Sequence, residues 1–244
     1  MLASFTLALQ FLTRLPLNLC ITISDQRIGQ SVLFYPLIGL IIGAVLALTS
    51  YLLGEQTLAL NAAIILTVWV LLTGGLHLDG LADCSDAWAG GLAGKEQSLA
   101  IMKDPSAGPI AVIILVLLLL LKWTALQCLL QQQEALIPLL FSPFLGRVSI
   151  LILMLSTPYI SKNGLGSVMQ QHLPKHPARL IVLFSLILCF WLTNIYILLA
   201  TLTVTALIRY LALQRLQGVT GDVYGASVEL VEAVVLISLV LTNG

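Results

Sequence analysis

The sequence predicts an all-α integral membrane protein, a single polytopic helix bundle over residues 1–244 with about seven transmembrane helices. First, 59% of the residues are hydrophobic and only 9% are charged, whereas soluble domains carry about 25% charged residues. Second, apolar segments recur at about the 20 residues that a membrane-spanning helix needs. Third, Lys and Arg gather in alternate loops. Because so few polar groups cannot cover an apolar core, lipid is the natural solvent for this chain.

The N-terminal segment, residues 1–20, is apolar but does not have the pattern of a cleaved signal peptide. It has no basic region at its start, and Arg14 lies inside the apolar stretch. We expect a helix that lies in the membrane interface or enters the membrane and returns. A full crossing is the alternative, and the number of spans depends on it.

Further along the chain, five segments have the length and composition of single spans: residues 33–53, 57–76, 109–130, 136–156 and 226–243. Residues 179–212 form an apolar stretch of about 34 residues, which is too long for one untilted span and suits two short ones. Thr193 and Asn194 are the best candidates for the turn between them.

The basic residues support this arrangement. If 179–212 is a hairpin, one set of loops holds nine of them: Arg14, Arg27, Lys95, Lys103, Lys162, Lys175, Arg179, Arg209 and Arg215. The short loops near 54–56, 131–135 and 193–194 hold none. Since Lys and Arg prefer cytoplasmic loops, the rich side is predicted to be cytoplasmic, and the active-site loops lie there.

Several other patterns are uninformative or absent. The net charge of zero gives no indication of nucleic-acid binding, and the four cysteines have no spacing typical of disulfides or zinc. Phosphate-loop, serine-hydrolase and zinc-protease motifs are missing. Gly39 and Gly43 form a GxxxG pair, which indicates either a close helix contact or a chance pair of small residues.

The clearest chemical pattern is an acidic cluster at residues 77–88. Asp79, Asp83 and Asp86 share one face of a helix within about 60°. Such carboxylates repel one another unless a cation lies between them, and oxygen ligands suit Mg²⁺ or Mn²⁺. The alternative is a solvated acidic loop. His77 lies on the opposite face and is not expected to be a ligand.

A second acidic cluster lies at the start of the last apolar helix. Asp222, Glu229 and Glu232 fall in a glycine-rich segment, residues 218–232. A charge inside a span costs at least about 2.5 kcal/mol, so the two glutamates require a cation, a base or a water-filled cavity. Asp222 can be a metal ligand, the N-cap of the helix, or both.

Basic groups suitable for phosphate accompany these acids. Lys103 could bind a phosphate that Asp104 orients, or it could meet lipid headgroups. Arg147 lies near the middle of its span, which makes it a functional candidate, with Pro143 and Gly146 expected to open the helix. Lys122 can reach the interface by extending its side chain. Two acidic clusters and several cations on one membrane face fit metal-assisted phosphoryl transfer.

Five stretches resemble the cobalamin synthase family, whose members are adenosylcobinamide-GDP ribazoletransferases. They are FLTRLP at 11–16, FYPLIGLIIG at 34–43, GGLHLDGLAD at 74–83, IMKDPSAGP at 101–109 and GVTGDVYGASVELVE at 218–232. They extend over essentially the whole chain. Residues 107–112 read AGPIAV where the family usually has an aromatic-containing IGxYGV, which affects local contacts only.

The resemblance implies a reaction and a location. Adenosylcobinamide-GDP and α-ribazole, or its 5′-phosphate, would give adenosylcobalamin, or its 5′-phosphate, and GMP. Mg²⁺ would be the cofactor. The protein would lie in the cytoplasmic membrane of a prokaryote, in contact with membrane lipid. The acidic string also resembles that of CDP-alcohol phosphotransferases, which are the closest competing interpretation. An ion-coupled transporter is a more distant one, and the lack of an internal repeat disfavours it.

Residue roles follow from the resemblance as hypotheses. Asp79, Asp83 and Asp86 would hold Mg²⁺, and Asp222 and Glu229 would complete that site or hold a second ion. Glu232 is the first candidate for the base that takes the ribazole hydroxyl proton, with Glu229 as a further catalytic candidate. Residues expected to contact phosphate or substrate are Arg14, Lys103, Asp104, Arg147 and Thr220.

Overall fold

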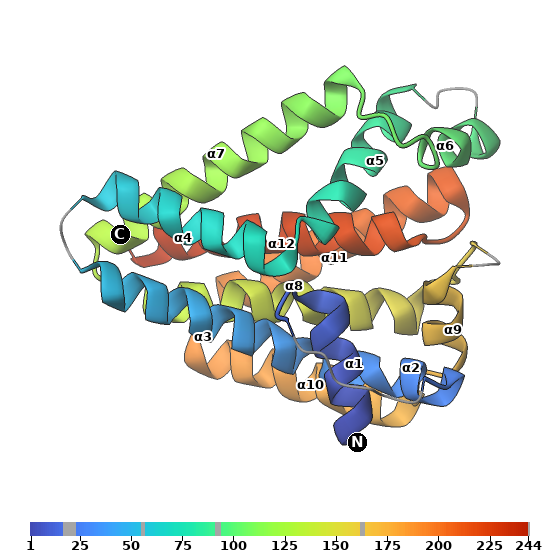
Figure 1. Ribbon diagram of the computed structural model, residues 1–244, viewed down its shortest axis with the longest axis horizontal. Helices are drawn as coiled ribbons and strands as arrows, with labels where there is room; N and C mark the ends of the chain where they lie inside the picture. Colours follow the sequence, from blue (N-terminus) through green and yellow to red (C-terminus); the bar gives the residue numbers. More distant parts are fainter. Residues whose placement is uncertain (17–22, 55–56, 91–93, 162–163, 244) are drawn as a thin grey trace.

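The computed structural model describes residues 1–16, 23–54, 57–90, 94–161 and 164–243, and in these ranges the chain is a bundle of α-helices (Figure 1). The helices are α1 (Leu2–Leu12), α2 (Asp25–Ser31), α3 (Tyr35–Leu53), α4 (Leu58–Thr73), α5 (Leu76–Gly90), α6 (Lys95–Ile101), α7 (Pro109–Gln131), α8 (Leu136–Ser156), α9 (Leu165–Gln171), α10 (Lys175–Leu192), α11 (Ile195–Leu216) and α12 (Gly221–Asn243), with a 3₁₀ turn at Val32–Phe34.

Six helical segments in the described ranges are long and apolar enough to cross a membrane. The pair α4 and α5, bent by 89° at their junction, brings the number to seven if it counts as one broken span. The prediction of about seven spans is therefore confirmed. Helix α1 has only 11 residues, or roughly 16 Å, which is too short to cross and agrees with the expected interfacial or re-entrant helix.

The predicted hairpin at 179–212 is confirmed. Helix α10 ends at Leu192 and α11 begins at Ile195, with the turn at Thr193 and Asn194. The Asn194 side chain accepts a hydrogen bond of 3.0 Å from the Ile197 amide, so it caps the second helix as Asn commonly does.

The hairpin also sorts the loops between the two ends of the bundle. One end carries α2, α6, α9 and the turn between α11 and α12, while the α3–α4, α7–α8 and α10–α11 connections lie at the other (Figure 1). The first end carries Arg27, Lys95, Lys103, Lys175 and Arg215, as the charge pattern predicts, whereas Arg14 lies at the bend between α4 and α5. Lys162 lies outside the described residues.

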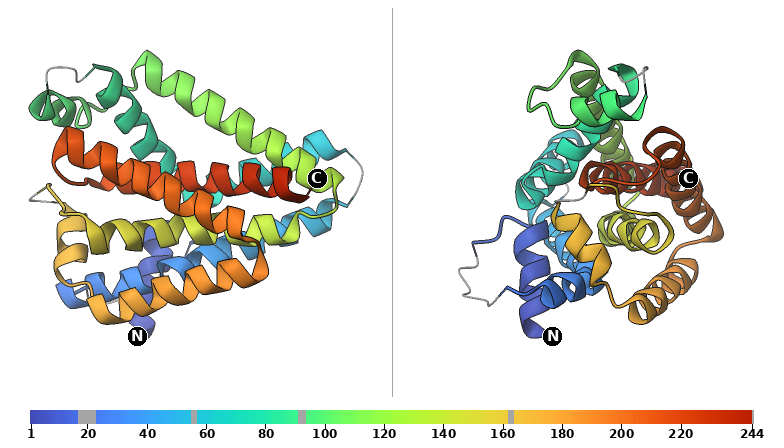
Figure 2. Two further views of the ribbon diagram at one scale, coloured as in Figure 1. Left: turned by 180° about the vertical axis from the view of Figure 1, so that it is seen from behind. Right: turned by 90° about the vertical axis from the view of Figure 1, so that its right-hand side faces the viewer.

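Helix α8 lies at the centre of the bundle, with α3, α10, α11 and α12 packed around it (Figure 2). Gly39 and Gly43 of α3 pack directly on its backbone: a Cβ added to Gly39 would lie 2.5 Å from the Pro143 carbonyl oxygen, and one on Gly43 would lie 2.5 Å from the Leu139 carbonyl oxygen. The GxxxG pair is therefore a specific helix contact rather than a chance pair of small residues.

The bend between α4 and α5 brings the first acidic cluster against α12. Gly74 and Gly75 both adopt positive φ, 65° and 68°, which side chains disfavour and glycine permits. Helix α5 then crosses α12 closely, because a Cβ on Gly80 would lie 2.8 Å from the backbone of Asp222. The two acidic segments, far apart in sequence, thus meet at one place.

Candidate functional site

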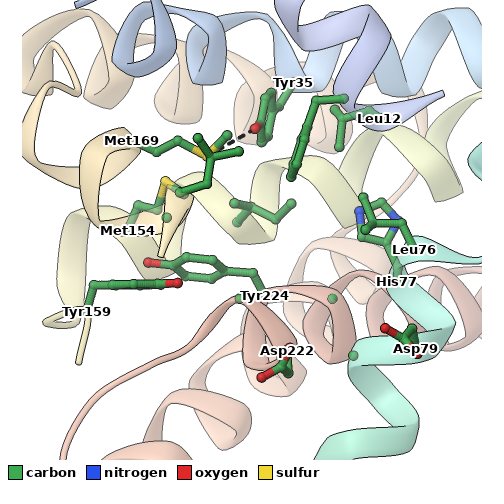
Figure 3. Close-up of a pocket in the computed structure, with 17 residues that line it drawn as sticks. Leu12, Tyr35, Leu76, His77, Asp79, Met154, Tyr159, Met169, Asp222 and Tyr224 are labelled. Atoms are coloured by element: carbon green, nitrogen blue, oxygen red, sulfur yellow. Dashed lines mark hydrogen bonds between the residues drawn. The ribbon is translucent and has the colours of Figure 1, made fainter. Parts of the chain in front are cut away.

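A cavity of about 270 Å³ lies where α5 and α12 meet. Asp79 and Asp222 lie at one end of it, and Tyr35, Met154 and Met169 at the other (Figure 3). The walls come from α1, α3, α5, α8, α9, α12 and the segment after α8. The cavity therefore has a carboxylate end and an apolar end.

The carboxylate end gathers negative charge without a basic partner. Asp79 and Asp222 line the cavity, and Asp83 lies one turn after Asp79 on α5, close enough for the charges of Asp222 and Asp79 to act on it. Among the described residues, the acids that form ion pairs are Glu229 and Glu232. Asp79, Asp83 and Asp222 form no ion pair there. Like charges placed this way favour binding of a cation.

Thr220, and not Asp222, caps α12. The Thr220 hydroxyl accepts a hydrogen bond of 3.4 Å from the Val223 amide and donates one of 3.2 Å to Asp222 Oδ2. Asp222 follows as the second residue of the helix, in its first turn, where the helix dipole favours negative charge. Of the two roles considered for Asp222, the N-cap is therefore taken by Thr220, which leaves the Asp222 carboxylate at the cavity.

A second cavity of about 410 Å³ adjoins the first and brings Lys103 to the site. The two cavities share Tyr159, Gly221 and Asp222, so they meet at the first turn of α12. Thr220 also lines the second cavity. An exposed lysine and a helix N-terminus beside carboxylates form a suitable place for a phosphate group that also meets a metal ion.

Tyr159 is held at this junction by backbone pairing with the segment before α12. The Ile160 amide donates to the Val219 carbonyl at 3.0 Å, and the Val219 amide donates to the Pro158 carbonyl at 2.9 Å. Burial, together with the charge of Asp222, raises the pKa of the Tyr159 phenol. The phenol therefore stays protonated at neutral pH and is a hydrogen-bond donor.

The structure places Asp86 at the start of α7. Its carboxylate accepts hydrogen bonds from the Gly108 amide at 2.5 Å and the Ala111 amide at 2.9 Å. Both carboxylate oxygens are thereby engaged by backbone groups that would otherwise lack partners at a helix N-terminus. This geometry gives no support to the prediction that Asp86 holds Mg²⁺. The prediction used only the helix face that Asp86 shares with Asp79 and Asp83, and that pattern carries no information about where α7 docks.

Asp104 and Arg14 lie beside the cavities without lining them. Asp104 accepts from the Ser106 amide at 2.9 Å and from the Ser106 hydroxyl, which lowers the pKa of the exposed carboxyl and fixes the turn after Lys103. Arg14 is exposed at the bend between α4 and α5, where its side chain lies over Gly74 and its amide donates to the Leu72 carbonyl at 2.7 Å.

The two glutamates of α12 belong to a buried ion cluster, which we define as Lys122, Arg147, Glu229 and Glu232. The Lys122 ammonium lies 2.6 Å from Glu229 Oε2 and 2.6 Å from Glu232 Oε2, and Arg147 pairs with the other oxygen of Glu232. All four residues are at most 5% exposed. The predicted need for cationic partners is confirmed, while the expectation that Lys122 reaches the interface is wrong.

The buried ion cluster lies behind the cavity wall, next to His77. An Arg147 amino nitrogen, Nη2, lies 3.4 Å from His77 Nδ1. A guanidinium only donates, so Nδ1 accepts and the imidazole proton is on Nε2. Helix α8 runs unbroken through Pro143 and Gly146, so the expected opening beside Arg147 does not occur. The structure thus does not bring Arg147, Glu229 or Glu232 into the cavity.

As placed, no three His, Cys, Asp or Glu side chains of the described residues converge closely enough to form a metal site by themselves. The unpaired acids still suit Mg²⁺, which is usually bound through one or two carboxylates together with waters and substrate phosphates. The donor chemistry of Asp79, Asp83 and Asp222 therefore fits a cation that arrives with a phosphorylated substrate.

The apolar end of the cavity contains residues that sequence reasoning missed. Tyr159 and Tyr224 stack with ring centroids 5.9 Å apart at 24°, and Tyr35 donates a hydrogen bond of 3.4 Å to the Met169 sulfur. Tyr35 and Tyr224 lie within stretches that the sequence analysis quoted for the family resemblance, but no role was assigned to either. Tyr159 and Met169 come from separate elements, and nothing in their local sequence distinguishes them from lipid-facing residues.

Comparison with known proteins identifies relatives along the whole chain. The sequence profile of a family described as cobalamin-5-phosphate synthase matches residues 4–240. An adenosylcobinamide-GDP ribazoletransferase of Pseudomonas aeruginosa is 50% identical over 243 residues, covering 98% of each chain. One of Pseudomonas fluorescens is 47% identical over 240 residues, covering 97% of this chain and 98% of the relative. No solved structure matches the chain.

Proposed function

Because the chain belongs to the cobalamin-5-phosphate synthase family, we propose that it joins ribazole to adenosylcobinamide-GDP in the cavity between α5 and α12. The observation that carries this assignment is the meeting of Asp79 and Asp83 with Asp222 across two helices remote in sequence. The ribazole hydroxyl oxygen bonds to the phosphorus on the cobinamide side, and the bond from that phosphorus to GMP breaks.

The carboxylate end suits a substrate-borne Mg²⁺ ion. When bound, the cation neutralises the pyrophosphate and stabilises the charge that develops on the leaving GMP. Asp79, Asp83 and Asp222 are the residues that would hold it, since none of them has a basic partner among the described residues. Glu229 is excluded from this set by its pairing with Lys122.

The other residues of the site position the reactants. Lys103, exposed in the adjoining cavity, holds pyrophosphate oxygens, and the protonated Tyr159 phenol donates a hydrogen bond at the junction. Glu232 has both carboxylate oxygens paired with cations, which makes it a poor proton acceptor. Since Mg²⁺ is usually bound through one or two carboxylates, we assign the ribazole hydroxyl proton to the one of Asp79, Asp83 and Asp222 that the cation leaves free.

The end of the bundle with the site is also the end with the basic loops. By the preference of Lys and Arg for the cytoplasmic side, the active site faces the cytoplasm from the inner membrane. Both substrates are polar at their reacting ends, a pyrophosphate on the donor and a ribose hydroxyl on the acceptor, and they reach such a site without crossing lipid.

The test is the release of GMP by purified protein in detergent, supplied with adenosylcobinamide-GDP and α-ribazole. We expect GMP with Mg²⁺, loss of the reaction in excess EDTA, and recovery when Mg²⁺ is restored. CDP-activated alcohols should give no CMP. Unchanged GMP release in EDTA would contradict the metal assignment, and CMP without GMP would indicate the CDP-alcohol reaction instead.

A further inference from the structure

We infer that the apolar end of the cavity is the subsite for the base of ribazole, the acceptor, and not for the guanine of the donor. This inference rests on the proposed function and adds to it the identity of the group that enters the cavity. Ribazole is a ribonucleoside whose base, a dimethylated benzimidazole, is flat and almost entirely apolar.

The size of the cavity limits what can enter. Its volume of about 270 Å³ lies just below the roughly 300–1,000 Å³ of pockets that enclose drug-sized ligands. A single nucleoside is of that size, whereas adenosylcobinamide-GDP is several times larger. Only one end of the donor, or the whole acceptor, can therefore occupy it.

The walls of the apolar end fit an aromatic ring with methyl groups. Met154 and Met169 line it, and methionine sulfur makes favourable contacts with aromatic rings. The stacked pair Tyr159 and Tyr224 supplies a flat surface on one side, and Leu12 lies on the other (Figure 3). Contact between these side chains and an apolar aromatic ring is favourable in free energy.

The same walls do not suit guanine. The guanine edge carries two donor nitrogens and a carbonyl oxygen, and each loses hydrogen bonds to water on burial. The lining of the apolar end contains no carboxylate or amide side chain; its polar groups are phenol hydroxyls, of which Tyr35 already donates to the Met169 sulfur and Tyr224 has no partner among the described residues. Guanine would thus be buried there without the carboxylate or amide that could accept from both of its donor nitrogens.

The direction of the cavity gives the acceptor a productive orientation. With its base between the methionines and the tyrosines, the ribose of ribazole extends toward Asp79 and Asp222 at the other end. The ribose hydroxyl then lies beside the carboxylates, and the donor pyrophosphate enters from the adjoining cavity of Lys103. Acceptor and donor thus approach from different cavities that meet at Asp222.

The test compares ribazole with its analogue that lacks the two methyl groups. In the native protein, two buried methyl groups should favour ribazole by roughly tenfold in kcat/KM. We expect Met169→Ala to reduce this preference to about threefold or less, and to leave the KM for adenosylcobinamide-GDP unchanged. Met154→Ala, on the same wall, is the second variant if Met169→Ala does not fold.

Leu129→Ala is the matched control, because it removes a buried side chain of α7 that does not line the cavity. It should lower thermal stability by a similar amount and keep the native preference for methyl groups. A raised KM for adenosylcobinamide-GDP with an unchanged methyl preference in the methionine variants would overturn the inference. Failure of the proposed function would look different, since the native protein would then release no GMP with either acceptor.

Discussion

Asp222→Asn and Asp79→Asn are each expected to lower the kcat for GMP release at least about a hundredfold. Each change removes one of the carboxylates that converge from α12 and α5 and keeps the shape of the side chain. Neither acid has a basic partner in the described residues, so loss of its charge should not weaken the fold. The measurement is the initial rate of GMP release at saturating substrates and Mg²⁺.

Asp86→Asn is the matched control for charge removal on the same helix. Asn caps helices about as well as Asp and keeps one acceptor oxygen, so this variant should keep one of the two α7 hydrogen bonds and reduce the rate only a few-fold. Asp83→Ala should behave like the Asp79 and Asp222 variants. Near-full GMP release by Asp83→Ala with Mg²⁺ present would show that the metal assignment is wrong. The assignment would also be wrong if Asp86→Asn lost GMP release while the other variants kept it.

Lys122→Met is expected to destabilise the protein by about 3–5 kcal/mol, the usual cost of removing one partner from a buried ion pair. Lys122 is 3% exposed and contacts both Glu229 and Glu232, so its loss leaves a buried excess of negative charge. The measurement is the thermal unfolding temperature of the purified variant in detergent, followed by intrinsic fluorescence.

The double variant Lys122→Met with Glu229→Gln restores the charge balance, because Glu232 keeps its pair with Arg147. It should recover a large part of the unfolding temperature lost by the single variant. If both variants unfold at the native temperature, the buried ion cluster does not stabilise the bundle. If the double variant is no more stable than the single one, charge balance is not the cause.

The spans were predictable because lipid imposes a length and a composition on each of them. The hairpin at 179–212 followed from length and charge together, since about 34 apolar residues are too many for one untilted span and two helices there keep the basic loops on one side. The 89° bend between α4 and α5 was not predicted. The glycines at 74 and 75 permit it, but the packing of Gly80 on α12 decides its direction.

The candidate site was predictable in part. Spacing put Asp79, Asp83 and Asp86 on one helix face, yet Asp86 is engaged by α7, which begins 23 residues later and docks through tertiary packing. The cost of charge in lipid correctly required partners for Glu232, but Lys122 lies 110 residues away. The apolar end of the cavity is formed by separate elements, and no local pattern indicates it.

The central claim is that carboxylates of α5 and α12 share one divalent cation. Mn²⁺ binding in the presence of adenosylcobinamide-GDP, followed by electron paramagnetic resonance, tests it most directly. We predict one tight substrate-dependent site in the native protein, weakened by Asp79→Asn and by Asp222→Asn alike, and retained by Asp86→Asn. Full retention of that site in either of the first two variants would contradict the claim.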